Sequence, residues 1–189
     1  VDEFLDRTDC DGVPEHAFPG LGHMAQARGY ATGVVSTARL THATPASVYA
    51  SSADRNYEDD SKLPKGCTGQ EDIASQLINS NLDLAMGGGR RHFIPKSTKD
   101  QEGKNGKRTD GKNLIEAWKE DGGQYAWNND THSRLDLNGG KILGLFESSH
   151  MKYEHDRTGE PSLAEMTKTA IQYLENKSEK GFFLVVEAG

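Results

Sequence analysis

The chain has 189 residues, of which 34% are hydrophobic and 27% are charged, with a mean hydropathy of -0.75. This length suits one well-cored domain or a part of one, and the polar composition predicts long solvated loops without reaching the disordered class. The net charge of -7 argues against nucleic acid as the main partner, and no apolar run approaches the roughly 20 residues of a membrane span.

The first half of the chain alternates helix-like and strand-like patterns. Apolar residues at helical spacing predict a helix over 14–28 that stops at Gly29, and the β-branched run at 30–36 predicts a buried strand. A second helix is expected over 70–79 and a second strand over 82–86. The order helix, then apolar strand, therefore occurs twice.

The second half repeats this order, with a helix expected over 113–118 and a strand over 141–146. Pro161 marks the start of an amphipathic helix, and the strand at 181–186 follows it. Helices that alternate with fully apolar strands predict an α/β fold whose mostly parallel sheet is covered on both faces. Ligands bind beyond the carboxyl ends of the strands in such sheets. The polar segment at about 96–112 is expected to be an exposed loop or insertion.

Two local patterns have simple interpretations. The glycines at 87–89, with Arg90 and Arg91, follow a strand but lack the Lys and Ser/Thr of a P-loop, so a tight strand exit is favoured over a nucleotide site. Cys10 and Cys67 are too distant in sequence for a CxxC motif. Their spacing leaves a long-range disulfide and two buried thiols equally open.

Polar residues cluster after the first expected strand and at the end of the last. His42, Thr44 and Arg55 belong to the first group, and Glu187 ends the second. Taken singly, they suit a loop residue, a helix cap, a solvated charge and an exposed strand end. Their order along the chain carries more information than any one of them.

The order of several separate motifs resembles that of the alkaline phosphatase family from about Cys10 to Gly189. These motifs are VSTARLTHATPASVYA, RNY, GQEDIASQL, LDLAMGGGR, GLFE, MKYE and PSLAEMTKTAIQYL, followed by KGFFLVVE. The resemblance implies a three-layer α/β/α sandwich and the metal-dependent hydrolysis of small phosphomonoesters. It also implies a homodimer.

The resemblance also assigns roles to the polar cluster. Thr44 and Glu187 match the family's magnesium ligands, and hard oxygen donors suit that cation. His42 stands where some members carry Asp, and a neutral imidazole is a poorer magnesium ligand, so we expect it to act in a second shell or through water. Arg55 matches the arginine that grips two phosphate oxygens.

Further features resemble the animal-type branch of the family. Phe146, through its carbonyl, and Glu147, Glu160 and Glu102, through their carboxylates, match its calcium site. Cys10 and Cys67 match a disulfide of that branch, which predicts an exported protein: periplasmic, extracellular or anchored at a membrane surface.

The family pattern also predicts what this chain does not contain. Residues 1–189 are expected to form an internal part of one alkaline phosphatase domain, with the nucleophilic serine and most ligands of two zinc ions supplied by sequence outside it. The chain alone is then expected to be inactive. The alternative is a non-catalytic, metal-binding or structural domain derived from the same scaffold.

Overall fold

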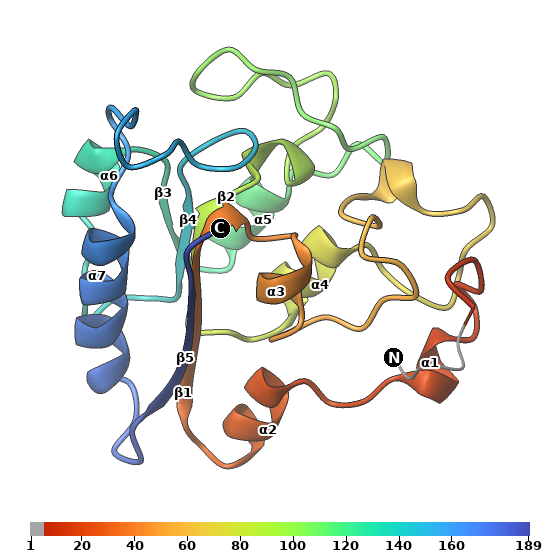
Figure 1. Cartoon of the computed structure of the whole chain (residues 1–189), viewed down its shortest axis with the longest axis horizontal. Coiled ribbons are helices and arrows are strands. Elements are labelled where there is room, and N and C mark those ends of the chain that lie inside the picture. The colour runs from red at the N-terminus through yellow and green to blue at the C-terminus, as the bar shows by residue number, and fades with distance from the viewer. Residues whose placement is uncertain (1–5) are drawn as a thin grey trace.

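A computed structural model of the chain describes residues 6–189 and contains a parallel five-stranded sheet between two layers of helices (Figure 1). The strands are β1 (Ala31–Arg39), β2 (Leu84–Gly88), β3 (Gln124–Ala126), β4 (Ile142–Leu145) and β5 (Phe182–Glu187). They lie in the order β3-β4-β2-β1-β5, and every neighbouring pair is parallel. Their carboxyl ends therefore share one edge of the sheet.

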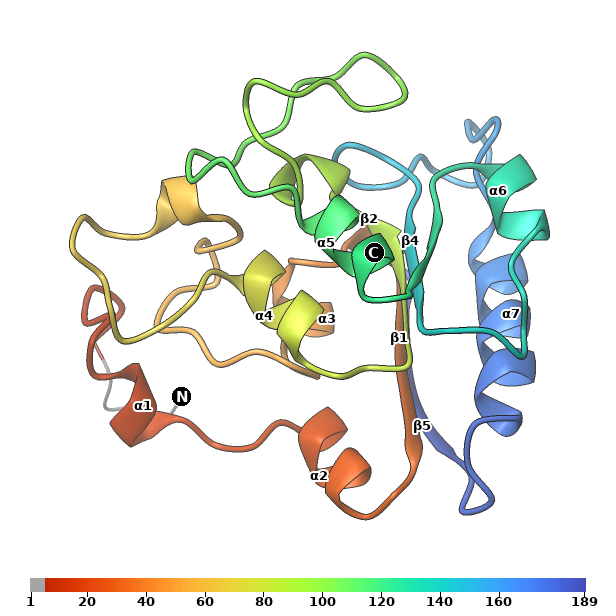
Figure 2. The ribbon, with the colours of Figure 1, turned by 180° about the vertical axis from the view of Figure 1, so that it is seen from behind.

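The helices divide between the two faces of the sheet. They are α1 (Val13–His16), α2 (Leu21–Ala27), α3 (Ala43–Ala46), α4 (Ile73–Asn79), α5 (Leu114–Glu120), α6 (Asn129–Ser133) and α7 (Leu163–Glu175), with two 3-10 turns, η1 (Asp60–Lys62) and η2 (Arg90–His92). Figures 1 and 2 show α6 and α7 on one face and α2 to α5 on the other. The predicted α/β fold with a sheet covered on both faces is confirmed.

Each face of the sheet has its own apolar core. Val34 packs with Leu77 of α4, whereas the next residue, Val35, packs with Met166 and Leu174 of α7. Successive strand residues point to opposite faces, so an apolar strand fills both cores at once. All five side chains are at most 2% exposed, and burial of each stabilises the fold by about 1.5–3 kcal/mol.

The N-terminal part of the chain differs from its prediction. The single helix expected over 14–28 is broken into α1 and α2, because Pro19 lacks an amide hydrogen and disfavours helical geometry at Phe18. The expected apolar face is also not buried. Phe18 is 65% exposed, Leu21 64% and Met24 39%.

The helix predicted after Pro161 is α7, and its start is well defined. The Ser162 hydroxyl accepts a hydrogen bond from the Glu165 amide, and the Glu165 carboxylate accepts one from the Ser162 amide. This reciprocal capping satisfies backbone donors that would otherwise lack a partner at the helix start.

Two long-range connections hold the loops. A disulfide joins Cys10 to Cys67, with 5.7 Å between their Cα atoms, which resolves the two alternatives left open by the sequence. The segment at 96–112 is largely exposed, but Gly106 and Arg108 are buried within it. In the part of the chain that the structure describes, no helix is long and apolar enough to cross a membrane.

Candidate functional site

The carboxyl edge of the sheet gathers most of the residues singled out in the sequence. His42 and Thr44 follow β1, Glu147 follows β4, and Glu187 ends β5. Ser36 of β1 is the register partner of Glu187, and its hydroxyl donates a 2.6 Å hydrogen bond to Glu187 Oε2. This bond holds the carboxylate beside the segment that follows β1.

His42 and Arg55 are brought into contact across 13 residues of sequence. His42 caps the start of α3, and its Nε2 lies 2.9 Å from Nη2 of Arg55, whose side chain is exposed. Burial lowers the pKa of His42, and the charges of Arg39 and Arg55 lower it further, against smaller opposite effects of Glu58 and Glu187. The imidazole is therefore neutral at neutral pH.

Thr44 lies in α3 and is exposed at the same edge. Its carbonyl accepts a 2.7 Å hydrogen bond from the Ser47 hydroxyl, which stabilises the short helix. The side-chain oxygens of Thr44 and Glu187 are hard donors of the kind that magnesium prefers. This donor chemistry fits the cation that the sequence predicts for the edge.

A buried polar network next to His42 was not singled out in the sequence. The guanidinium of Arg39 donates to both carboxylate oxygens of Glu58, at 2.8 and 2.9 Å, and the Thr41 hydroxyl donates to the same carboxylate at 2.6 Å. Beyond Glu58, His92 Nδ1 lies 2.5 Å from Asp59 Oδ2. Arg39 and Thr41 stand within the quoted β1 motif, but their partners come from separate segments, so a short pattern could not pair them.

Burial and the neighbouring polar groups change the pKa values of Glu58 and Asp59 in opposite directions. Burial alone would raise the pKa of Glu58, but hydrogen bonds from Arg39 and Thr41 and the charge of His92 outweigh it, so the pKa lies below its usual value. The pKa of Asp59 is also lowered, because hydrogen bonds from His92 and Ser61 outweigh its burial. Both groups are therefore ionised at neutral pH.

The four residues predicted for a calcium site line one hollow of about 230 Å³. They are Glu102, Phe146, Glu147 and Glu160. Glu160 is 2% exposed and burial raises its pKa. Its Oε1 accepts a 2.8 Å hydrogen bond from the Lys152 amide, whereas its buried Oε2 has no hydrogen-bond partner among the described residues. A buried oxygen without a donor suits a bound cation.

Basic side chains already balance the other two carboxylates of this hollow. Lys152 Nζ lies 3.1 Å from Glu147 Oε1, and the buried Arg90 contacts Glu102. Among residues 6–189, the only group of at least three acidic, His or Cys side chains with ligand atoms within 4.8 Å of one another is Cys10, Asp11 and Cys67. Both sulfurs of that group are in the disulfide, so it is not a metal site.

The glycines at 87–89 serve close packing. A Cβ at Gly88 would meet the Ser149 carbonyl oxygen at 2.1 Å, and Gly89 has a φ of 100°, in the region that favours glycine. Their geometry is that of the tight strand exit favoured by the sequence.

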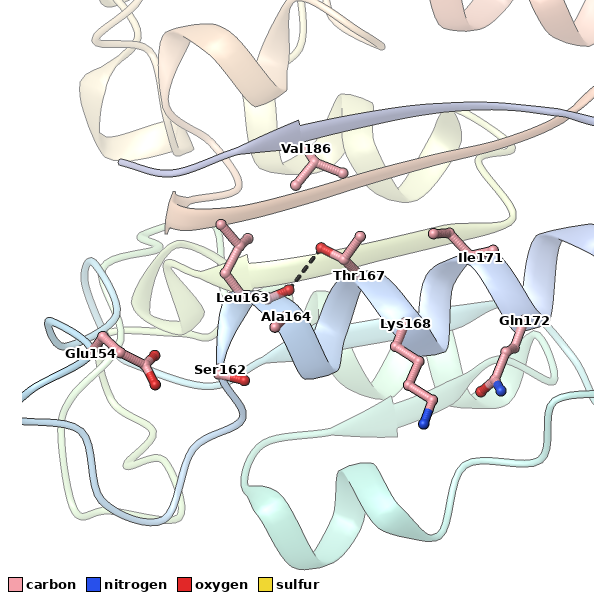
Figure 3. Close-up of a pocket in the computed structure, with 9 residues that line it drawn as sticks. All are labelled: Glu154, Ser162, Leu163, Ala164, Thr167, Lys168, Ile171, Gln172 and Val186. Atoms are coloured by element: carbon pink, nitrogen blue, oxygen red, sulfur yellow. Dashed lines mark hydrogen bonds between the residues drawn. The ribbon is translucent and has the colours of Figure 1, made fainter.

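A separate groove of about 760 Å³ lies between α7 and β5 (Figure 3). Leu163, Thr167 and Ile171 of α7 face Val186 of β5 there, and none of the predicted site residues lines it. Its lining is mainly apolar and offers no paired catalytic groups.

The chain is a three-layer α/β protein with a cluster of polar side chains at the carboxyl edge of its sheet. The alkaline phosphatase family model matches residues 13–189. The chain belongs to the alkaline phosphatase family.

Individual relatives agree with this assignment. The membrane-bound alkaline phosphatase of Bombyx mori is 39% identical over 203 residues, covering 97% of this chain and 36% of the relative. The tissue-nonspecific isozyme of Homo sapiens is 38% identical over 206 residues, covering 100% and 39%. This chain therefore spans little more than a third of these curated relatives.

Solved structures share the fold. The alkaline phosphatase of Thermus thermophilus superposes with a TM-score of 0.68 at 30% identity, covering 99% of this chain and 38% of that one. A mutant TAB5 alkaline phosphatase with Mg bound in its M3 site has a TM-score of 0.66 at 26% identity, covering 88% and 41%. The family thus includes metal-bound members.

Proposed function

We propose that this chain is part of an enzyme that hydrolyses small phosphate monoesters, with Arg55 as the phosphate clamp and Thr44 and Glu187 as magnesium ligands. Two contacts at the carboxyl edge of the sheet support the proposal: His42 with Arg55, and Ser36 with Glu187. The sheet is that of a member of the alkaline phosphatase family. Parallel α/β sheets place their ligands at this edge.

Each residue of the site has a role that follows from its chemistry. The planar guanidinium of Arg55 binds two phosphate oxygens at once and offsets the charge that develops on them. Ser36 keeps Glu187 oriented, and His42 acts through Arg55 or through water rather than as a direct magnesium ligand. Thr44 and Glu187 would hold magnesium, which would supply positive charge next to the phosphate; the family resemblance also implies two zinc ions, with ligands mostly outside residues 1–189, that would supply the charge needed to activate a nucleophile and a water.

We further propose that the hollow at Glu160 holds calcium. Glu102, Glu147 and Glu160 supply carboxylates and Phe146 a carbonyl oxygen, the hard donors that calcium takes. The support is the buried Glu160 Oε2, whose lack of a hydrogen-bond donor a cation would compensate. Such a site stabilises the scaffold and takes no part in the reaction.

The disulfide and the relatives support a proposal for where the protein is located. Disulfides persist in oxidising compartments, which supports an exported protein, and one relative is described as membrane-bound. We expect the whole protein to be a homodimer that acts on small phosphomonoesters. The acidic net charge of -7 argues against nucleic acid as the main partner.

The test is hydrolysis of p-nitrophenyl phosphate with zinc and magnesium added, by this chain and by the full polypeptide that its gene encodes. We expect turnover by the full polypeptide, a loss of about a hundredfold or more in Arg55→Ala, and none by residues 1–189 alone. An inactive full polypeptide that still binds magnesium would favour the alternative of a non-catalytic metal-binding domain.

A further inference from the structure

His150 lies in the loop after β4 and faces the end of β1. The Gly89 amide donates to the carbonyls of Glu147 and Ser149, at 3.0 and 2.8 Å, and the Met151 amide donates to the Thr37 carbonyl at 2.9 Å. These bonds attach the loop to the ends of β2 and β1 on both sides of His150. The backbone position of this histidine is therefore fixed by the sheet.

The imidazole of His150 contacts two residues of the candidate site. Nδ1 lies 3.3 Å from the Arg39 amide nitrogen, and Nε2 lies 2.5 Å from Arg39 Nη1. The ring also meets the ring of His42 edge-to-face, with 5.2 Å between centroids and an interplanar angle of 76°. Aromatic rings favour this arrangement.

Arg39 gives His150 a rigid support. Its guanidinium is anchored by two hydrogen bonds to Glu58, and the side chains of both residues are less than 15% exposed. His150 is therefore held between the fixed Arg39 and the ring of His42.

The orientation of Arg55 depends on His42. Arg55 is exposed, and no described carboxylate lies within ion-pair distance of its guanidinium. Its contact with His42, at 2.9 Å, is what orders the guanidinium. A long side chain loses much rotamer freedom when it binds a ligand, and preorganisation reduces that loss.

We propose that His150 is a positioning residue of the phosphate site, which holds the His42 ring against Arg55 and so preorients the guanidinium for an oxyanion. The proposal rests on the proposed role of Arg55 as phosphate clamp. His150 itself does not touch the phosphate; it acts through His42.

The experiment measures binding of inorganic phosphate, with magnesium present, through the side-chain Nε–Hε resonance of Arg55 in ¹⁵N-labelled protein. The resonance is assigned by its loss in Arg55→Lys. We expect His150→Ala to weaken phosphate binding by about threefold to tenfold, the cost of ordering one long side chain. His150→Phe keeps an aromatic edge against His42 and is expected to bind phosphate within about twofold of the unsubstituted chain.

Two controls separate positioning from a loss of structure. His155→Ala removes an exposed histidine a few residues away and should leave phosphate binding unchanged. Thermal unfolding of His150→Ala should match that of the unsubstituted chain, because His150 is exposed and outside both apolar cores.

The outcomes distinguish the two proposals. If phosphate shifts the Arg55 resonance equally in the unsubstituted chain and in His150→Ala, the role of His150 is wrong and the clamp remains. A resonance that does not respond to phosphate in the unsubstituted chain contradicts the clamp, and the role of His150 with it.

Discussion

The guanidinium of Arg108 donates two hydrogen bonds to the carboxylate of Asp72, at 2.9 and 3.0 Å, inside the molecule. Arg108 belongs to the polar segment at 96–112 and is 1% exposed, whereas Asp72 caps the start of α4 by accepting from the Ser75 amide. A loop rich in charged residues is thus fixed to a core helix by one buried ion pair.

Removal of one partner of this pair should destabilise the chain strongly. Arg108→Ala leaves Asp72 buried with fewer donors, and we expect the free energy of unfolding to fall by about 3–5 kcal/mol. Urea denaturation followed by circular dichroism measures the change. Lys107→Ala, which alters the exposed neighbouring residue, should change stability by less than about 0.5 kcal/mol. Equal stability of the two variants would contradict the role given to the ion pair.

The sequence predicted the central part of the fold better than its edges. The apolar run at 141–146 indicates a strand because both faces of the inner strand β4 are buried, and the capped helix after Pro161 has a clear local signature. The three residues of β3 are too few to produce a pattern. Phe18 and Leu21 have the spacing of a buried helix face, but both are exposed and Pro19 interrupts the helix between them.

The candidate site was also predicted only in part. The family motifs drew attention to Arg55 and Glu187, because each stands in a recognisable run of sequence. His150 stands in the loop after β4, and only the strand order brings it against Arg39 of β1. Contacts between loops that follow different strands depend on topology, which residue spacing does not encode.

The disulfide between Cys10 and Cys67 should contribute substantially to stability. It encloses a loop with a sequence separation of 57 residues, and the chain-entropy model gives about 4 kcal/mol for loss of such a link. We expect the Cys10→Ser, Cys67→Ser double variant to unfold at lower urea, and reduction of the unsubstituted chain to have the same effect. The double variant itself should not respond to reductant; a response there would show that reductant acts elsewhere.

Calcium should stabilise the chain through Glu160. Binding to the folded state alone adds about 2.7 kcal/mol when calcium is at one hundred times its dissociation constant, which raises the melting temperature. Glu160→Gln removes one carboxylate oxygen, and we expect most of the calcium-dependent rise to disappear. Glu154→Gln alters an exposed glutamate of the same loop and should keep the rise. A calcium response that survives Glu160→Gln would place the cation elsewhere.

Acid should destabilise the chain partly through Glu58. Its folded pKa lies below the ordinary value of 4.5, so its ion pair with Arg39 contributes stability that is complete above that pH. The contribution is lost as the pH falls from about 4.5 through the lower folded pKa, because the unfolded state then binds the proton first. Glu58→Gln should be less stable than the unsubstituted chain at pH 7, and the gap should narrow towards acid. Glu175→Gln, at the exposed end of α7, should follow the unsubstituted chain throughout. Urea denaturation at a series of pH values gives both profiles, and a gap that stays constant down to strong acid would show that Glu58 is not ionised more readily in the folded state.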